Sequence, residues 1–77
     1  MGYGSFVKSK EAVLDNPKRR KMYDIILKSG GKTADEIKKE TGLTMESVDY
    51  HLHYLQMTGF IHTTERNPYT YRPVRDP

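Results

Sequence analysis

The chain has 77 residues, no cysteine and four prolines, and its 13 Lys and Arg against 10 Asp and Glu give a formal charge of +3 at pH 7. This length holds one small domain, and the lack of cysteine excludes disulfides, thiolate metal sites and a thiol nucleophile. No apolar run approaches the roughly 18 residues of a membrane span, and the N-terminus lacks the apolar stretch of a secretory signal. We therefore expect a cytoplasmic, intracellular domain.

Charge is divided unevenly along the chain. Residues 1–39 carry ten Lys or Arg and five Asp or Glu, a net charge of +5, whereas residues 40–65 carry four acidic residues and no Lys or Arg, a net charge of −4. Residues 66–77 add three Arg and one Asp, a net charge of +2. The positive charge should therefore surround an acidic middle segment.

The first half of the chain predicts a flexible end at residues 1–5, followed by one domain over residues 6–74. A short extra helix can begin at Ser5 or Ser9. Asn16 and Pro17 predict the start of the first long helix, with Asn16 as the N-cap and Pro17 at the first helical position. Gly30, followed by a second glycine, ends this helix because glycine accepts the left-handed conformation.

The second and third helices are separated by a sharp turn. Thr33 and Glu36 form a capping box for a helix of about two turns, which ends at Gly42. Thr44 then caps a helix over residues 44–58. Its apolar stripe, at spacings of three and four, consists of Met45, Val48, Leu52 and Leu55.

After Gly59 the hydrophobic period shortens to about two. Residues 60–65 and 69–74 predict two strands, with a turn at residues 66–68 and a flexible end at residues 75–77. The order predicts a mainly α (α+β) fold, a winged helix-turn-helix with a three-helix core and a two-stranded β-hairpin wing.

The turn and the helix after it resemble a known family. Residues 42–61 read GLTMESVDYHLHYLQMTGFI, and residues 12–17 read AVLDNP. These runs, with Tyr69-Thr70-Tyr71-Arg72 at the close of the wing, resemble the arsenic-repressor-like (ArsR) winged helix-turn-helix regulators. The resemblance implies sequence-specific binding of double-stranded DNA and transcriptional regulation, usually as a dimer, by a nucleoid-associated protein.

A winged helix of this kind would place helix 44–58 in the major groove and wing 60–74 on the backbone or in the minor groove. The candidate base-reading residues are Thr44, Met45, Glu46, Ser47, Asp49, Tyr50, His53 and Tyr54. The candidate phosphate-binding residues are Lys18, Arg19, Arg20, Lys32, Lys38, Lys39, Arg66 and Arg72.

The predicted recognition helix carries Glu46 and Asp49 but no Lys or Arg, so cations elsewhere would have to bind the phosphates. An alternative is a protein-interaction module that uses the acidic, tyrosine-rich face of helix 44–58. A second copy of the chain is one partner for that face, and the sequence leaves monomer and homodimer open.

Catalysis and metal binding find little support in the sequence. There is no Gly-rich phosphate loop, and the core is too small to enclose a substrate. Asp49 and His53 share a helix face, but two ligands without a third do not make a metal site. We expect no enzyme activity, no cofactor, no metal, and neither a membrane nor a small-molecule substrate as partner.

Overall fold

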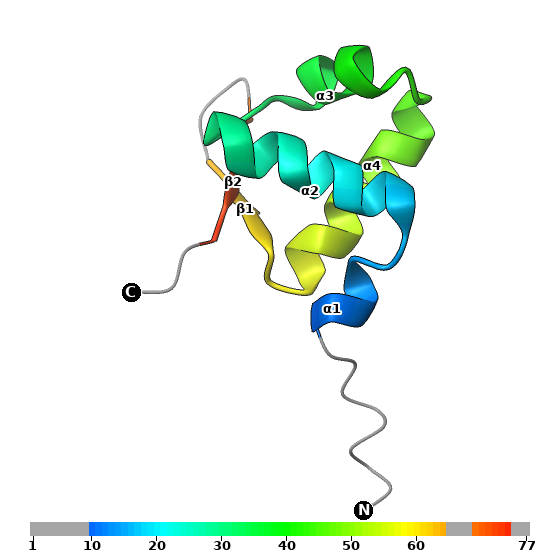
Figure 1. Ribbon diagram of the computed structural model, residues 1–77. Helices are drawn as coiled ribbons and strands as arrows, with labels where there is room; N and C mark the ends of the chain where they lie inside the picture. The colour runs from blue at the N-terminus through cyan, green and yellow to red at the C-terminus, as the bar shows by residue number, and fades with distance from the viewer. Residues whose placement is uncertain (1–9, 65–68, 75–77) are drawn as a thin grey trace, which may run out of the picture.

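The computed structural model describes residues 10–64 and 69–74, over which four helices precede a two-stranded hairpin (Figure 1). The helices are α1 (Lys10–Val13), α2 (Pro17–Ser29), α3 (Ala34–Thr41) and α4 (Met45–Met57). The strands are β1 (Ile61–Thr63) and β2 (Tyr71–Pro73). The predicted short extra helix is thus present as the single turn α1. The predicted flexible ends at residues 1–5 and 75–77 and the turn at residues 66–68 lie outside the described residues.

Side-chain caps begin the three longer helices where the sequence predicted them. The Asn16 carboxamide oxygen accepts hydrogen bonds from the backbone N–H groups of Lys18 and Arg19, at 3.0 and 3.1 Å. Thr33 forms the predicted capping box at the start of α3, and the Thr44 hydroxyl accepts from the backbone N–H of Ser47 at 3.2 Å. The caps satisfy backbone donors that helices leave free, which is why these helices begin where they do.

Left-handed glycines end α2 and α3. Gly30 has a φ of 79° and Gly42 a φ of 72°, conformations that side chains with a Cβ rarely adopt. Gly42 therefore makes the sharp corner between α3 and α4 that the helix-turn-helix pattern requires.

The core forms where side chains of α2, α3, α4 and β1 pack together. Its fully buried side chains are Met22, Ile26, Ile37, Val48, Leu52, Leu55 and Ile61. The stripe predicted on α4 is confirmed, with Met45 only partly buried at its first turn. Burial of this stripe fixes which side of α4 is left facing outward. No helix among the described residues is long and apolar enough to span a bilayer.

The hairpin is shorter than predicted, because the regular pairing extends over three residues on each strand. Ile61 pairs with Pro73, His62 with Arg72 and Thr63 with Tyr71. The connection before α3 adds a bridge that the sequence did not predict: the Tyr71 N–H donates to the Lys32 carbonyl at 2.7 Å, and the Lys32 N–H donates back at 3.1 Å. The hairpin is therefore hydrogen-bonded to the connection between α2 and α3.

Gly31 lies where this connection and the hairpin approach each other. A Cβ atom at position 31 would stand 2.9 Å from the Thr70 Cγ2 methyl and 3.4 Å from the Arg72 Cγ atom. The first distance is below ordinary van der Waals contact and the second is at its lower limit, so the close approach to Thr70 favours a glycine there.

We predict that Gly31→Ala lowers the free energy of unfolding by about 1–3 kcal/mol, because the added methyl overpacks the contact with Thr70. Urea denaturation followed by circular dichroism measures the change. Thr70→Ser removes the opposing methyl group, so the double variant should regain part of the lost stability. Equal losses in the single and double variants would contradict the proposed clash.

Candidate nucleic-acid interface

The outward face of α4 presents four side chains along one stripe. Glu46, Asp49, Tyr50 and His53 are spaced by three and four residues, and all four are exposed. They lie opposite Val48 and the other core-facing residues of the helix. We call these four residues the outward stripe, and all four belong to the predicted base-reading set.

The other predicted base-reading residues lie at the edges of this stripe. Thr44 is exposed, but its hydroxyl is occupied as the helix cap. Met45 is half-buried and packs against the core, and Ser47 is also half-buried. Tyr54 is 37% exposed, with one face of its ring covered by the Arg19 guanidinium. These four are therefore less available to a groove than the outward stripe.

The prediction that Arg19 binds phosphate requires a correction. Its side chain is only 8% exposed, its Nη1 atom donates to the Val13 carbonyl at 2.7 Å, and its Cζ atom lies 3.9 Å from the centre of the Tyr54 ring. The guanidinium is thus a structural link between α1, α2 and α4. The sequence held a signal for this burial, because Arg19 precedes Met22 and Ile26 by three and seven residues on the same helix face.

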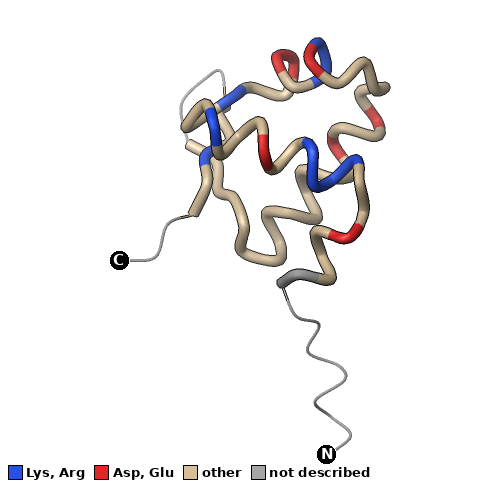
Figure 2. Tube along the Cα trace, in the orientation of Figure 1, with Lys and Arg blue, Asp and Glu red and all other residues tan. Residues whose placement is uncertain are grey.

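The remaining cations of α2 are free of this constraint. Lys18, Arg20 and Lys21 are exposed at the start of the helix, and we call them the basic turn. This turn lies beside α4, since Arg19 contacts Tyr54 and the charge of Lys18 acts on His51. Figure 2 marks the cations at the start of α2 in blue and the acidic positions of α4 in red.

The predicted cations of the α3 region differ in their availability. Lys38 and Lys39 are exposed on α3. Lys32 is instead held by Glu40, with 2.5 Å between its Nζ and the carboxylate, and this hydrogen bond raises the pKa of Lys32. Its charge is therefore already partly neutralised by the protein. Arg66 lies outside the described residues.

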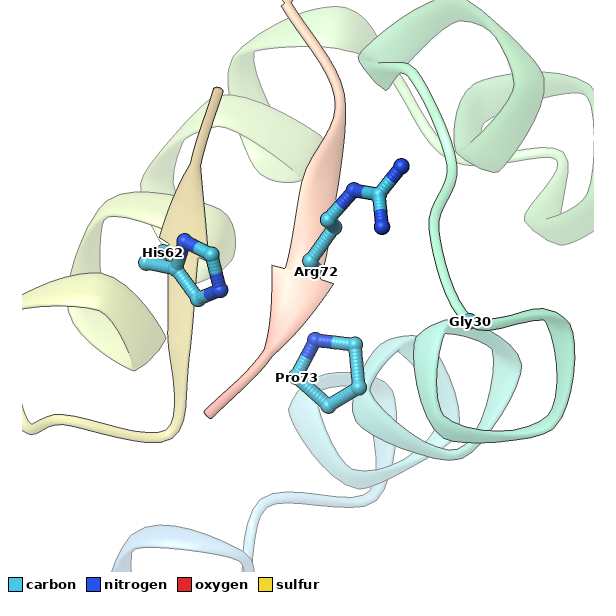
Figure 3. Close-up of a pocket in the computed structure, with 4 residues that line it drawn as sticks. All are labelled: Gly30, His62, Arg72 and Pro73. Carbon is cyan, nitrogen blue, oxygen red and sulfur yellow. The ribbon is translucent and has the colours of Figure 1, made fainter. Parts of the chain in front are cut away.

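Arg72 lies on the face of the hairpin turned away from the core. Alternation along the strands puts Arg72 and His62 together on the solvent side, whereas Tyr71 and Ile61 point inward. Arg72, His62, Pro73 and Gly30 line an open hollow of about 310 Å³ (Figure 3). The sequence did not predict this hollow, because it depends on how the hairpin packs against the end of α2.

Tyr71 lies on the inward side of the hairpin, near the outward stripe. Burial, and then the negative charge of Asp49, raise the pKa of the Tyr71 hydroxyl. The influence of Asp49 shows that the hairpin flanks α4. The outward stripe therefore lies between the basic turn on one side and the hairpin on the other.

Comparison with known proteins identifies the family. The family described as sugar-specific transcriptional regulator TrmB matches residues 19–76. This chain belongs to the TrmB family. No curated protein is a significant match to the sequence of this family member.

Solved structures resemble this TrmB-family chain over most of its length. The Zalpha domain of Carassius auratus PKZ, solved in complex with Z-DNA, is 28% identical, with a TM-score of 0.70 over 74% of this chain and 92% of that domain. A transcriptional regulator homologue from Pyrococcus horikoshii OT3 is 26% identical, with a TM-score of 0.71 over 87% of this chain and 70% of that one. NolR from Sinorhizobium fredii shares the fold at 20% identity, with a TM-score of 0.71 over 84% of this chain and 64% of that one.

These comparisons confirm the predicted winged helix-turn-helix and the prediction of a DNA-binding transcriptional regulator. The family that matches is TrmB, whereas the sequence was interpreted as ArsR-like. Both belong to winged-helix regulators, and the motif at residues 42–61 identified that broader class. Among the described residues, no group of three His, Asp or Glu side chains is placed to hold a metal ion.

One buried histidine lies behind the outward stripe. His51 is 5% exposed and packs edge-on against Tyr50, with 5.0 Å between ring centres. Burial lowers the pKa of His51, and the positive charges of Arg19 and Lys18 lower it further. Within the described part of the chain, neither His51 Nδ1 nor Arg19 Nε has a hydrogen-bond partner. The packing therefore favours the neutral imidazole.

We predict that the burial of His51 makes the free energy of unfolding depend on pH. Folding lowers the pKa of His51, so the unfolded chain binds a proton at this histidine more readily than the folded chain does. The contribution of the neutral imidazole to the free energy of unfolding is complete above the unfolded pKa of about 6.5 and is lost as pH falls below that value. Urea unfolding at pH 7.5 and pH 5.5 should show a smaller difference for His51→Leu than for the wild type. A pKa for His51 above 6.5 in an NMR titration would contradict this prediction.

Proposed function

We propose that the chain recognises a B-form duplex sequence-specifically, with the first half of α4 in the major groove. The observation that carries this proposal is the outward stripe, Glu46, Asp49, Tyr50 and His53, exposed on the second helix of the helix-turn-helix and flanked by the basic turn and the hairpin. Winged helices and other helix-turn-helix proteins present base-reading side chains from this position.

The chemistry of the outward stripe favours particular bases. The carboxylates of Glu46 and Asp49 can accept hydrogen bonds from the cytosine N4 amino group in the major groove. The Tyr50 hydroxyl and the His53 imidazole can both donate and accept. We therefore expect a target in which cytosines face the centre of α4.

Phosphate binding is assigned to cations around the stripe. Lys18 and Arg20 are exposed at the start of α2, and Lys38 and Lys39 are exposed on α3. Cations in these positions can fix the protein on the backbone while α4 contacts the bases. Arg66, between the two strands in the sequence, completes the proposed set, whereas Arg19 is excluded by its burial.

The proposed protein binds DNA without enzymatic activity and is located with the chromosomal DNA. Residues 42–61 resemble ArsR-like regulators. This resemblance supports the proposed placement of α4 in the major groove, but it does not make the chain a member of that family. Tyr54, Met45, Thr44 and Ser47 would contribute at the edge of the reading surface.

A left-handed duplex is the second candidate ligand, because the chain resembles a domain solved in complex with Z-DNA. Glu46 and Asp49 on α4 argue against left-handed DNA as the preferred ligand. Contacts to the phosphates of the DNA backbone would bring these two carboxylates close to like charges. In the major groove of B-form DNA, by contrast, cytosine N4 amino groups can donate hydrogen bonds to these carboxylates. Binding to a d(CG) repeat held in the left-handed form, compared with the selected B-form duplex, separates the two.

We predict that selection from random duplexes enriches a cytosine-containing site and that Asp49→Ala or Tyr50→Ala reduces discrimination. Loss of a good base contact should cost about 1–3 kcal/mol on the selected site and far less on random DNA. Fluorescence anisotropy on both duplexes measures the difference. Equal losses on the two duplexes would show that these side chains do not read bases.

We predict that Arg20→Gln weakens binding to all duplexes and flattens the plot of log affinity against log salt by about one unit. Lys28→Gln, near the other end of the same helix, is the matched control and should leave the slope unchanged. An unchanged slope for Arg20→Gln would remove the basic turn from the phosphate contacts.

A further inference from the structure

A series of side-chain contacts links the buried Arg19 to the exposed Tyr50. The Arg19 Cζ atom lies 3.9 Å from the centre of the Tyr54 ring, and 6.2 Å separates the centres of the Tyr54 and Tyr50 rings. The Tyr50 ring also meets the His51 ring edge-on, with 5.0 Å between their centres. Tyr50 is 58% exposed, whereas Arg19 and His51 are buried. The series therefore runs from the interior of the protein to the outward stripe.

Two contacts fix the position of the Arg19 guanidinium. Its Nη1 atom donates to the Val13 carbonyl at 2.7 Å, and its plane covers the ring of Tyr54. A planar guanidinium can stack on a ring and donate to a carbonyl at the same time, whereas a lysine ammonium has no planar face. The Tyr54 ring therefore cannot turn away from Tyr50 without losing its contact with Arg19.

The burial of Arg19 has a cost that stability alone does not explain. Arg19 is 8% exposed, and within the described part of the chain its Nε atom has no hydrogen-bond partner. The one ion pair found between described residues joins Lys32 to Glu40, and Arg19 takes no part in it. A buried cation with an unpaired N–H group lowers stability relative to a well-packed apolar side chain. Departures of this kind from packing rules occur mostly at functional sites, which points to a role besides stability.

We propose that Arg19 is a positioning residue for base reading, which holds the Tyr50 side chain in one rotamer through the ring of Tyr54. The inference rests on the proposed function, because it concerns how a residue of the outward stripe is presented to DNA. A tyrosine that is already ordered in the free protein loses little rotamer freedom when it enters a groove. Ordering one side chain in advance corresponds to about three- to tenfold in affinity. The gain applies where Tyr50 contacts a base, and so it appears as discrimination between duplexes.

The first test measures the rotamer of Tyr50 in the free 77-residue chain. NMR couplings between its Hα and Hβ protons should show one dominant χ1 rotamer in the wild type. Arg19→Lys keeps the positive charge but lacks the planar face, and Tyr54→Leu removes the intervening ring. In both variants the couplings should average over the two rotamers that a helix allows. Averaged couplings in the wild type, or couplings that neither folded variant changes, would overturn the proposal.

The second test compares binding to the selected duplex and to random DNA by fluorescence anisotropy. Arg19→Lys should lose about three- to tenfold in affinity for the selected duplex and far less for random DNA. The slope of log affinity against log salt should stay as in the wild type, because a buried guanidinium contacts no phosphate. A flatter slope with equal losses on both duplexes would make Arg19 a phosphate contact and overturn the proposal.

A double-mutant cycle separates positioning of Tyr50 from a general loss of structure. In a Tyr50→Ala background, Arg19→Lys should cause no further loss of discrimination, because the side chain that it positions is gone. The control is Ile26→Val, a core substitution two turns further along α2 that lowers stability and leaves Arg19 and Tyr54 unchanged. This control should discriminate as the wild type does. Additive losses from Arg19→Lys and Tyr50→Ala, or an equal loss in the control, would overturn the proposal.

The two tests distinguish failure of this inference from failure of the proposed function. Thermal melting monitored by circular dichroism confirms that each variant is folded. A wild-type chain that does not discriminate between duplexes contradicts the proposed function, while the couplings still show whether Arg19 orders Tyr50. A chain that discriminates, but whose Tyr50 couplings and discrimination are the same in folded Arg19→Lys, overturns the positioning role alone.

Discussion

The contact of the Arg19 guanidinium with the Tyr54 ring and the Val13 carbonyl sets the arrangement on which the candidate interface depends. It joins α1, α2 and α4 at one place, and a cation over an aromatic ring is attracted to the negative face of that ring. Because Arg19 is held there, the start of α2 lies against the second half of α4. The same positive charge helps to keep the buried His51 neutral. Packing and surface electrostatics are therefore coupled through one side chain.

The distribution of charge assigns phosphate binding and base reading to different elements in the proposed complex, unlike in a winged helix with a basic recognition helix. In the proposed DNA complex, affinity for phosphate comes from α2, α3 and the wing, while α4 contributes selectivity through hydrogen-bond acceptors. An acidic reading surface also repels a misplaced backbone, so nonspecific binding should be weak.

The order of the elements could be predicted from local signals, because each depends on few neighbours. Asn16, Thr33 and Thr44 start helices by satisfying backbone donors, and Gly30 and Gly42 end them by adopting positive φ. The candidate site was predicted less completely. A count of charges cannot separate the buried Arg19 from the exposed Arg20, because the difference between them is a matter of which helix face meets the core.

The sequence by itself determined the helix boundaries, the core stripe of α4 and the class of winged-helix regulator, since caps, glycines and hydrophobic spacing act over a few residues. Only the tertiary structure decided which charges are available. It buried Arg19 between the Val13 carbonyl and the Tyr54 ring, paired Lys32 with Glu40, and turned Arg72 to the outer face of the hairpin. These outcomes depend on how separate helices and strands pack against one another, as between Arg19 of α2 and Tyr54 of α4, and caps, glycines and hydrophobic spacing do not specify that packing.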